Sequence, residues 1–219
     1  MNLQDGRLRN ARVTSAGCSG RLGKMPDDKT GFDSATTRTG MRVLVALLAL
    51  VCGCCPGAQA AMISLHPSKD NSIYSESDNS NARGELFAGV VVSGGLIRRA
   101  LLQFDLAAGG IPAGSTVNSV TLSLTMTRIN PGKTASLFEL HPALAAWGQG
   151  TSNGTGTGAQ PTANDATWYY RQYDADHWAT PGGDIGPVSG TATIGTVVAT
   201  TSYSFASQPG MVADVGNPR

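Results

Sequence analysis

Charged residues are scarce in this chain, and cysteine is missing from most of it. Only 14% of the 219 residues are charged, whereas about 25% is usual for soluble domains. All four cysteines lie within the first 60 residues, so residues 61–219 have no means of forming a disulfide framework or a thiolate metal site. Residues 61–219 also carry 11 acidic and 8 basic side chains. We therefore expect no nucleic-acid partner, because such a partner requires a basic surface.

Nucleophilic and zinc-dependent catalysis have no convincing motif in this chain. The one G-x-S-x-G spacing, Gly150–Gly154, lies in a loop rich in Gly and Thr and not between a strand and a helix, so it is not a nucleophile elbow. His66, His141 and His177 do not have the spacings of known zinc sites. Carboxylates suited to glycoside hydrolysis are present, but nothing in the sequence brings a pair to a working separation. We therefore predict that the chain is not an enzyme.

No apolar run is long enough to span a bilayer. The longest, Val43–Val51, is much shorter than the roughly 20 residues that a spanning helix needs. It follows Met41-Arg42 and precedes an Ala-Gln-Ala sequence ending at Ala60, which is the pattern of a signal peptide. We predict a signal peptide at residues 41–60, a secreted, extracellular protein and no stable membrane insertion. A lipid anchor at Cys54 is the less favoured alternative.

Residues 1–40 precede this export signal and show neither helical nor strand periodicity. Two interpretations are open. These residues are either a disordered extension or an over-extended reading frame whose true start is Met41. The second is favoured, because signal peptides normally open the chain.

Residues 61–219 have the two-residue period of β-strands. In Val120–Thr127 Val, Leu and Met alternate strictly with Thr and Ser, which predicts one face in the core and one in water. A looser alternation covers Arg99–Leu106. Further strands are expected at Ser72–Tyr74, Glu85–Val92, Ala135–His141, Thr191–Val198 and Ser202–Ala206. Since Gly- and Pro-rich turns separate these segments, we predict an all-β fold, an antiparallel β-sandwich of jelly-roll type, over residues 61–219.

One loop is unusually long and polar. Residues 148–165 contain no apolar side chain larger than Ala and are rich in Gly and Thr. Loops of this length are functional or mobile. We expect a mobile surface insertion here rather than a site.

Eight short segments carry a family resemblance through their order and spacing: Asp70–Tyr74, Asn81–Gly89, Arg98–Leu106, Ile111–Val117, Val120–Leu124, Trp147-Gly148, Asp165–Trp168 and Gly210–Val215. Together they resemble the DNRLRE domain, which is related to carbohydrate-binding modules for alginate-like polysaccharides. The resemblance implies a secreted bacterial protein with a jelly-roll fold that binds polysaccharide and is not catalytic. In that family further closing strands follow the last segment, so we expect a sandwich that lacks its last strands.

Aromatic residues gather in one stretch. Five of the thirteen lie within residues 168–178. Flat aromatic faces suit sugar rings, although packing in the core is the commoner use of Trp in a sandwich. Arg98, Arg99 and Arg171 are the expected partners of a uronate carboxylate, because Arg binds carboxylates bidentately. The candidate ligand-binding residues are Tyr170, Arg171, Tyr173, Trp178, Arg98 and Arg99.

These features predict an exported, non-catalytic module that binds polysaccharide, including acidic, uronate-containing polysaccharide. Two alternatives remain open: a structural or adhesive cell-surface spacer, and a fragment of a polysaccharide-degrading enzyme. Calcium is the one candidate cofactor, because Asp70 and Asp78 lie in loops rich in amide oxygens and hard cations prefer oxygen ligands. Asx-turns explain the same residues without a metal.

Overall fold

The chain is mostly β, with antiparallel strands, as predicted. A computed structural model describes residues 6–16, 61–91, 95–111, 115–129, 133–196 and 201–216. The signal peptide predicted at residues 41–60 lies outside these residues. The described elements are β1 (Gly6–Ala16), β2 (Met62–Leu65), β3 (Lys69–Tyr74), β4 (Leu86–Val91), β5 (Leu96–Gln103), β6 (Val120–Arg128), β7 (Ser136–Leu140), β8 (Tyr170–Gln172), β9 (Asp176–His177), β10 (Gly190–Ile194), β11 (Thr201–Phe205) and α2 (Pro209–Gly216).

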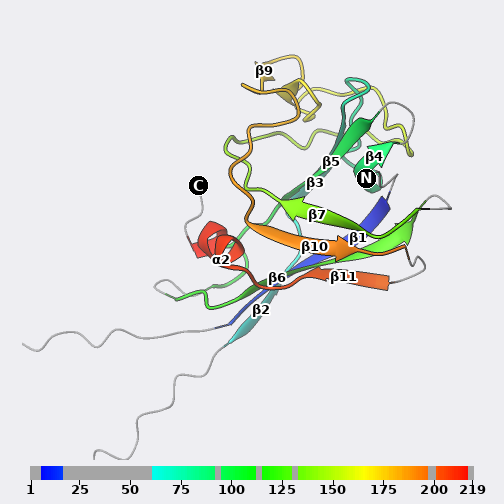
Figure 1. Cartoon of the computed structure of the whole chain (residues 1–219). Coiled ribbons are helices and arrows are strands. Elements are labelled where there is room, and N and C mark those ends of the chain that lie inside the picture. The colour runs from blue at the N-terminus through cyan, green and yellow to red at the C-terminus, as the bar shows by residue number, and fades with distance from the viewer. Residues whose placement is uncertain are drawn as a thin grey trace, which may run out of the picture.

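The strands form one large sheet and two small ones (Figure 1). The large sheet has seven strands in the order β11-β6-β1-β4-β5-β3, with β2 also paired to β1. The small sheets are β10–β7 and β8–β9. All seven strands expected from the sequence are present as β3 to β7, β10 and β11. The jelly-roll sandwich and the lack of its last strands stay predictions.

The buried face of β6 anchors the larger of two hydrophobic cores. Val120, Leu122, Leu124 and Met126 are at most 7% exposed, while the alternate residues of β6 are half-buried. This alternation confirms the two-residue period seen in the sequence. Residues of β2, β4, β10, β11 and α2 complete this core.

A second, smaller core lies on the other face of β3 and β5. It contains Ile73, Trp147, Ala166 and Trp178. Strand β5 separates the two cores, since Leu101 packs against the small core whereas its neighbours Ala100 and Leu102 pack against the large one. The small core supports the β8–β9 hairpin.

Strand β1 differs from the sequence expectation. Residues 1–40 show no strand periodicity, yet Gly6–Ala16 forms an eleven-residue strand inside the large sheet. The register with β6 shifts by one residue between Arg9 and Ala11, as in a β-bulge. This extra residue interrupts the two-residue period, which is why the pattern of apolar residues did not reveal the strand. That Met41 is the true start of the protein stays a prediction.

Helix α2 is a second element that the sequence pattern does not predict. Pro209 is its first residue, where the missing N–H and fixed φ of proline are favourable. Met211 is buried in the large core, so the helix packs against that core. Among the described residues, no helix is long and apolar enough to cross a membrane.

Candidate functional site

A buried polar network organises the end of the molecule that carries the hairpin. Asn71 is fully buried, and its Oδ1 accepts hydrogen bonds from Ser80 Oγ at 2.9 Å and from the N–H groups of Ser72 and Asn81 at 2.7 and 2.9 Å. Its Nδ2 donates to two carbonyl oxygens. The hydrogen-bonding capacity of the amide is therefore fully used inside the protein.

The long polar loop, residues 148–165, forms hydrogen bonds to this network. Asn71 Nδ2 donates to the carbonyl oxygen of Gln149 at 3.2 Å, and the N–H of Gly154 donates to Asn81 Oδ1 at 2.7 Å. Asp165, fully buried at the end of the loop, accepts the N–H of Thr162 at 2.6 Å. The expectation of a mobile insertion over residues 148–165 is therefore wrong. Its polar residues serve as hydrogen-bonding partners of the loops around β3.

Thr167 positions the start of the hairpin. Its buried Oγ1 accepts the N–H groups of Tyr169 and Tyr170 at 3.3 and 3.0 Å. The hairpin then turns at Asp174, whose φ of 61° lies in the left-handed region that Asp tolerates better than most residues. Strands β8 and β9 pair across this turn.

The hairpin carries a group of rings, which we call the hairpin aromatic cluster: Tyr170, Tyr173 and His177. The rings of Tyr170 and His177 lie 4.0 Å apart between centroids, tilted by 32°. Tyr173 meets Tyr170 edge-on at 5.3 Å. His177 is exposed and the two tyrosines are half-buried, while the adjacent Tyr169 is 45% exposed. The structure thus brings together two predicted ligand residues, Tyr170 and Tyr173.

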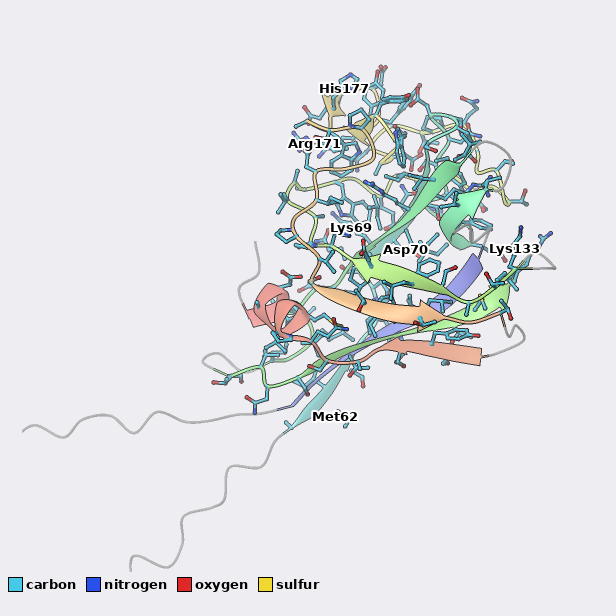
Figure 2. The ribbon with its side chains drawn as sticks, viewed as in Figure 1. Met62, Lys69, Asp70, Lys133, Arg171 and His177 are labelled. Atoms are coloured by element: carbon cyan, nitrogen blue, oxygen red, sulfur yellow. The ribbon has the colours of Figure 1, made fainter. Side chains whose placement is uncertain are left out.

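Arg171 lies on the same hairpin. Its Nη2 is 3.0 Å from Asp176 Oδ2, and its Nη1 donates to the carbonyl oxygen of Ala146 at 3.3 Å. About a third of its side chain is exposed. Figure 2 shows Arg171 and His177 together at the end of the molecule opposite Met62.

Trp178, another predicted ligand residue, lies in the small core. It is 5% exposed, and its Nε1 donates to the carbonyl oxygen of Thr167 at 3.0 Å. The indole has no free face for a sugar ring, so the core alternative holds for this residue.

Arg98 and Arg99 are also occupied within the chain. Arg98 is 7% exposed and forms an ion pair of 2.7 Å with Glu76. Arg99 lies 5.2 Å from the centre of the Trp168 ring and donates to the carbonyl oxygen of Gly182 at 2.6 Å. Burial lowers the pKa of the Arg99 guanidinium from its ordinary value. Arg99 thus connects Trp168, at the base of the hairpin, to the loop at Gly182, whereas Arg98 binds the connection that follows β3.

Gly182 lies at the base of the hairpin, at a position where no larger residue fits. Its φ is 91°, in a region that L side chains rarely adopt. A Cβ at this position would lie 2.8 Å from the Trp168 ring. The glycine thus permits the contact of Arg99 with both Trp168 and the loop.

The two carboxylates predicted for calcium have different partners. Asp70 accepts a hydrogen bond from Gln149 Nε2 at 3.1 Å, whereas Asp78 accepts one from Thr167 Oγ1 at 3.5 Å. In the part of the chain that the structure describes, no three His, Cys, Asp or Glu residues gather as a metal site would require. Calcium binding by Asp70 and Asp78 stays a prediction.

The raised pKa of Asp70 can be tested through the pH dependence of stability. Desolvation by burial raises the pKa of its carboxyl above the ordinary 3.8, so the folded state favours the protonated form. This contribution to stability is present at low pH and is lost as the pH rises through the raised pKa. We expect Asp70→Asn, which keeps an oxygen acceptor for Gln149, to gain stability relative to the wild type as the pH rises from below 3.8 to neutrality. Thermal unfolding of both proteins across this range measures the difference, and a constant difference would contradict the shift.

No protein-family model, curated protein or solved structure matches the chain. The fold and the site define a mostly β, antiparallel protein with an aromatic hairpin placed on a buried polar network. Segments that carry the DNRLRE resemblance, Asp70–Tyr74, Asn81–Gly89 and Asp165–Trp168, contribute Asn71, Asn81 and Asp165 to this network. The resemblance itself stays a prediction.

Proposed function

We propose that the chain is an exported, non-catalytic module of the jelly-roll type that binds polysaccharide at the β8–β9 hairpin. The observation that supports this is the hairpin aromatic cluster, together with the exposure of Tyr169, which precedes Tyr170 in the chain. These rings are presented at one end of the molecule, on a base fixed by Thr167 and the small core. A preformed aromatic surface binds with little loss of conformational freedom.

The chemistry of the hairpin suits a sugar chain. The apolar C–H face of a pyranose ring can cover an exposed tyrosine or the His177 ring. Burial of about 40 Å² of apolar surface contributes roughly 1 kcal/mol. Since only a few rings are available, the affinity expected after the cost of association is micromolar to millimolar.

Arg171 is the residue that would favour acidic chains. Its guanidinium is partly exposed, and its ion-pair partner Asp176 is also accessible. A uronate carboxylate would compete with Asp176 for this guanidinium, and such a partly exposed pair contributes about 1 kcal/mol or less and weakens with salt. We therefore expect a modest, salt-sensitive preference for polyuronate over neutral glucan.

Affinity gel electrophoresis tests the proposal. We expect the folded protein to be retarded in gels that contain alginate and less retarded in gels that contain a neutral glucan. Tyr170→Ala should weaken binding to both by about fivefold, which corresponds to roughly 1 kcal/mol. Leu137→Ala is the control, because Leu137 is 62% exposed on β7, outside the hairpin, and should leave retardation unchanged.

The acidic preference has its own matched pair of variants. Arg171→Gln should weaken retardation by alginate only, whereas Arg83→Gln, at an exposed position outside the hairpin, should weaken neither. Equal mobility of the folded protein in all gels would refute polysaccharide binding and favour the alternative of a spacer domain.

A further inference from the structure

The loop of residues 148–165 contains the one Asn-Gly pair of the chain, Asn153-Gly154. The side chain of Asn153 is exposed. Because glycine has no Cβ, the main-chain nitrogen that follows this Asn is unobstructed and can attack the carbonyl carbon of the Asn side chain. The pair therefore has the chemistry of a site of spontaneous deamidation.

Packing requires the glycine of this pair. A Cβ on Gly154 would overlap the main-chain carbonyl of Gly158 and lie 2.7 Å from the main-chain nitrogen of Ala159. The N–H of Gly154 also donates a hydrogen bond to Asn81 Oδ1 at 2.7 Å. The same residue that fits the loop against its neighbours thus makes Asn153 reactive.

The main chain is held on both sides of Asn153. Before it, the carbonyl oxygen of Ser152 accepts the N–H of Arg83 at 2.8 Å. After it, the N–H of Gly154 is held by Asn81. Ring closure requires the Gly154 nitrogen to turn toward Cγ of Asn153 and to lose its proton, so the hydrogen bond to Asn81 must break. We therefore expect the folded loop to slow the reaction.

We propose that Asn153 is a modification site, where spontaneous conversion to isoaspartate detaches the 148–165 loop from Asn81. The nitrogen of Gly154 attacks Cγ of Asn153 and forms a succinimide. The NH2 group of the carboxamide leaves as ammonia, with the proton that the Gly154 nitrogen gives up. Water then opens the ring at one of its two carbonyl groups, which yields Asp or isoaspartate.

Isoaspartate changes the course of the main chain. The chain then runs through the former side chain, so the path from Ser152 to Gly154 becomes longer by one carbon atom. The carbonyl oxygen of Ser152 and the N–H of Gly154 then no longer both fit their present partners, Arg83 and Asn81. Since Asn81 belongs to the buried polar network, we expect loss of one such hydrogen bond to lower the thermal midpoint by about 3 °C.

Incubation of the folded full chain at mildly alkaline pH tests the site. Trypsin then releases residues 134–171 as one peptide, and tandem mass spectrometry should find OH in place of NH2 at Asn153 and not at Asn164. Asn164 is the internal control, because it is exposed in the same loop but precedes Asp165, whose N–H donates to the carbonyl oxygen of Thr162 at 3.0 Å. Enzymatic isoaspartate methylation identifies the main-chain isomer.

Two comparisons measure the protection by the fold. In the chain unfolded by guanidinium chloride, Asn153 should deamidate about tenfold faster than in the folded chain, which corresponds to about 1.4 kcal/mol. In the folded chain, Asn81→Ala removes the acceptor of the Gly154 N–H and should raise the rate about fivefold. Asn79→Ala, which removes an exposed hydrogen bond to Thr157, should leave the rate unchanged. The comparison with the unfolded chain decides the question even if Asn81→Ala does not fold.

Asn153→Gln links the modification to stability. Its longer side chain would have to close a larger, less favourable ring, so this variant should keep its thermal midpoint during an incubation that lowers the midpoint of the wild type. The proposal is overturned if both proteins lose stability equally, or if Asn164 is modified as fast as Asn153. It is also overturned if unfolding leaves the rate at Asn153 unchanged, or if a long incubation leaves Asn153 of the folded chain unmodified.

Discussion

Asn71→Asp is expected to destabilise the protein by about 3 kcal/mol or more at neutral pH, because it places a carboxylate in a fully buried site. In the wild type, Asn71 Nδ2 donates to the carbonyl oxygens of Gln149 and Ala166, both at 3.2 Å. A carboxylate oxygen at the same place would face both carbonyl oxygens with no proton to donate. Denaturant unfolding at pH 7 measures the loss.

The same variant should recover part of its stability in acid. Burial and the two carbonyl oxygens favour the protonated carboxyl, so the pKa of the introduced Asp is raised in the folded state. The difference in the free energy of unfolding between the wild type and the variant therefore becomes smaller as the pH falls through that raised pKa. Asn79→Asp is the matched control, because Asn79 Nδ2 makes an exposed hydrogen bond to Thr157 at 2.9 Å, and should cost less than about 1 kcal/mol. Equal unfolding midpoints for the two variants would contradict the network.

Trp178→Ala is expected to cost about 3–5 kcal/mol, which is typical when a buried Trp is truncated. The variant loses the packing of the indole in the small core and the hydrogen bond from Nε1 to the carbonyl oxygen of Thr167. Trp178→Phe keeps much of the apolar volume and should be less destabilising. Chemical denaturation of the full chain measures both.

Tyr169→Ala is the comparison on the surface of the same hairpin. Tyr169 is 45% exposed, so its truncation should cost less than about 1 kcal/mol of stability. If Trp178→Ala were as stable as Tyr169→Ala, the placement of the indole in the core would be refuted. Loss of polysaccharide retardation in Trp178→Ala, in contrast, would report loss of the hairpin base rather than of a sugar contact.

The positions of the charged candidates show why a sequence cannot assign a binding role to an arginine. Arg98 and Arg99 are adjacent in β5, and their side chains have different partners, Glu76 for one and Trp168 with Gly182 for the other. Those partners come from distant parts of the chain. Whether a guanidinium meets a ligand or an internal acceptor depends on contacts that residue type and local spacing do not encode.

The buried polar network shows a similar limit. Its members Asn71, Asn81 and Asp165 are residues that also favour turns, and each fits a surface loop when read alone. Their burial follows from the packing of the 148–165 loop against the connection between β3 and β4. No local pattern distinguishes a solvated Asn from one whose every donor and acceptor is satisfied inside the protein.

The sequence by itself determined the β class and seven of the strands, because alternation of apolar and polar residues reports directly which face of a strand is buried. Only the tertiary structure decided that β1 is an inner strand, that Trp178 packs in the core and that Tyr170, Tyr173 and His177 share one hairpin. The physical reason is that periodicity is a local property of the chain. Partners across a sheet, occupants of a core and neighbours on a surface are set by contacts between residues far apart in sequence.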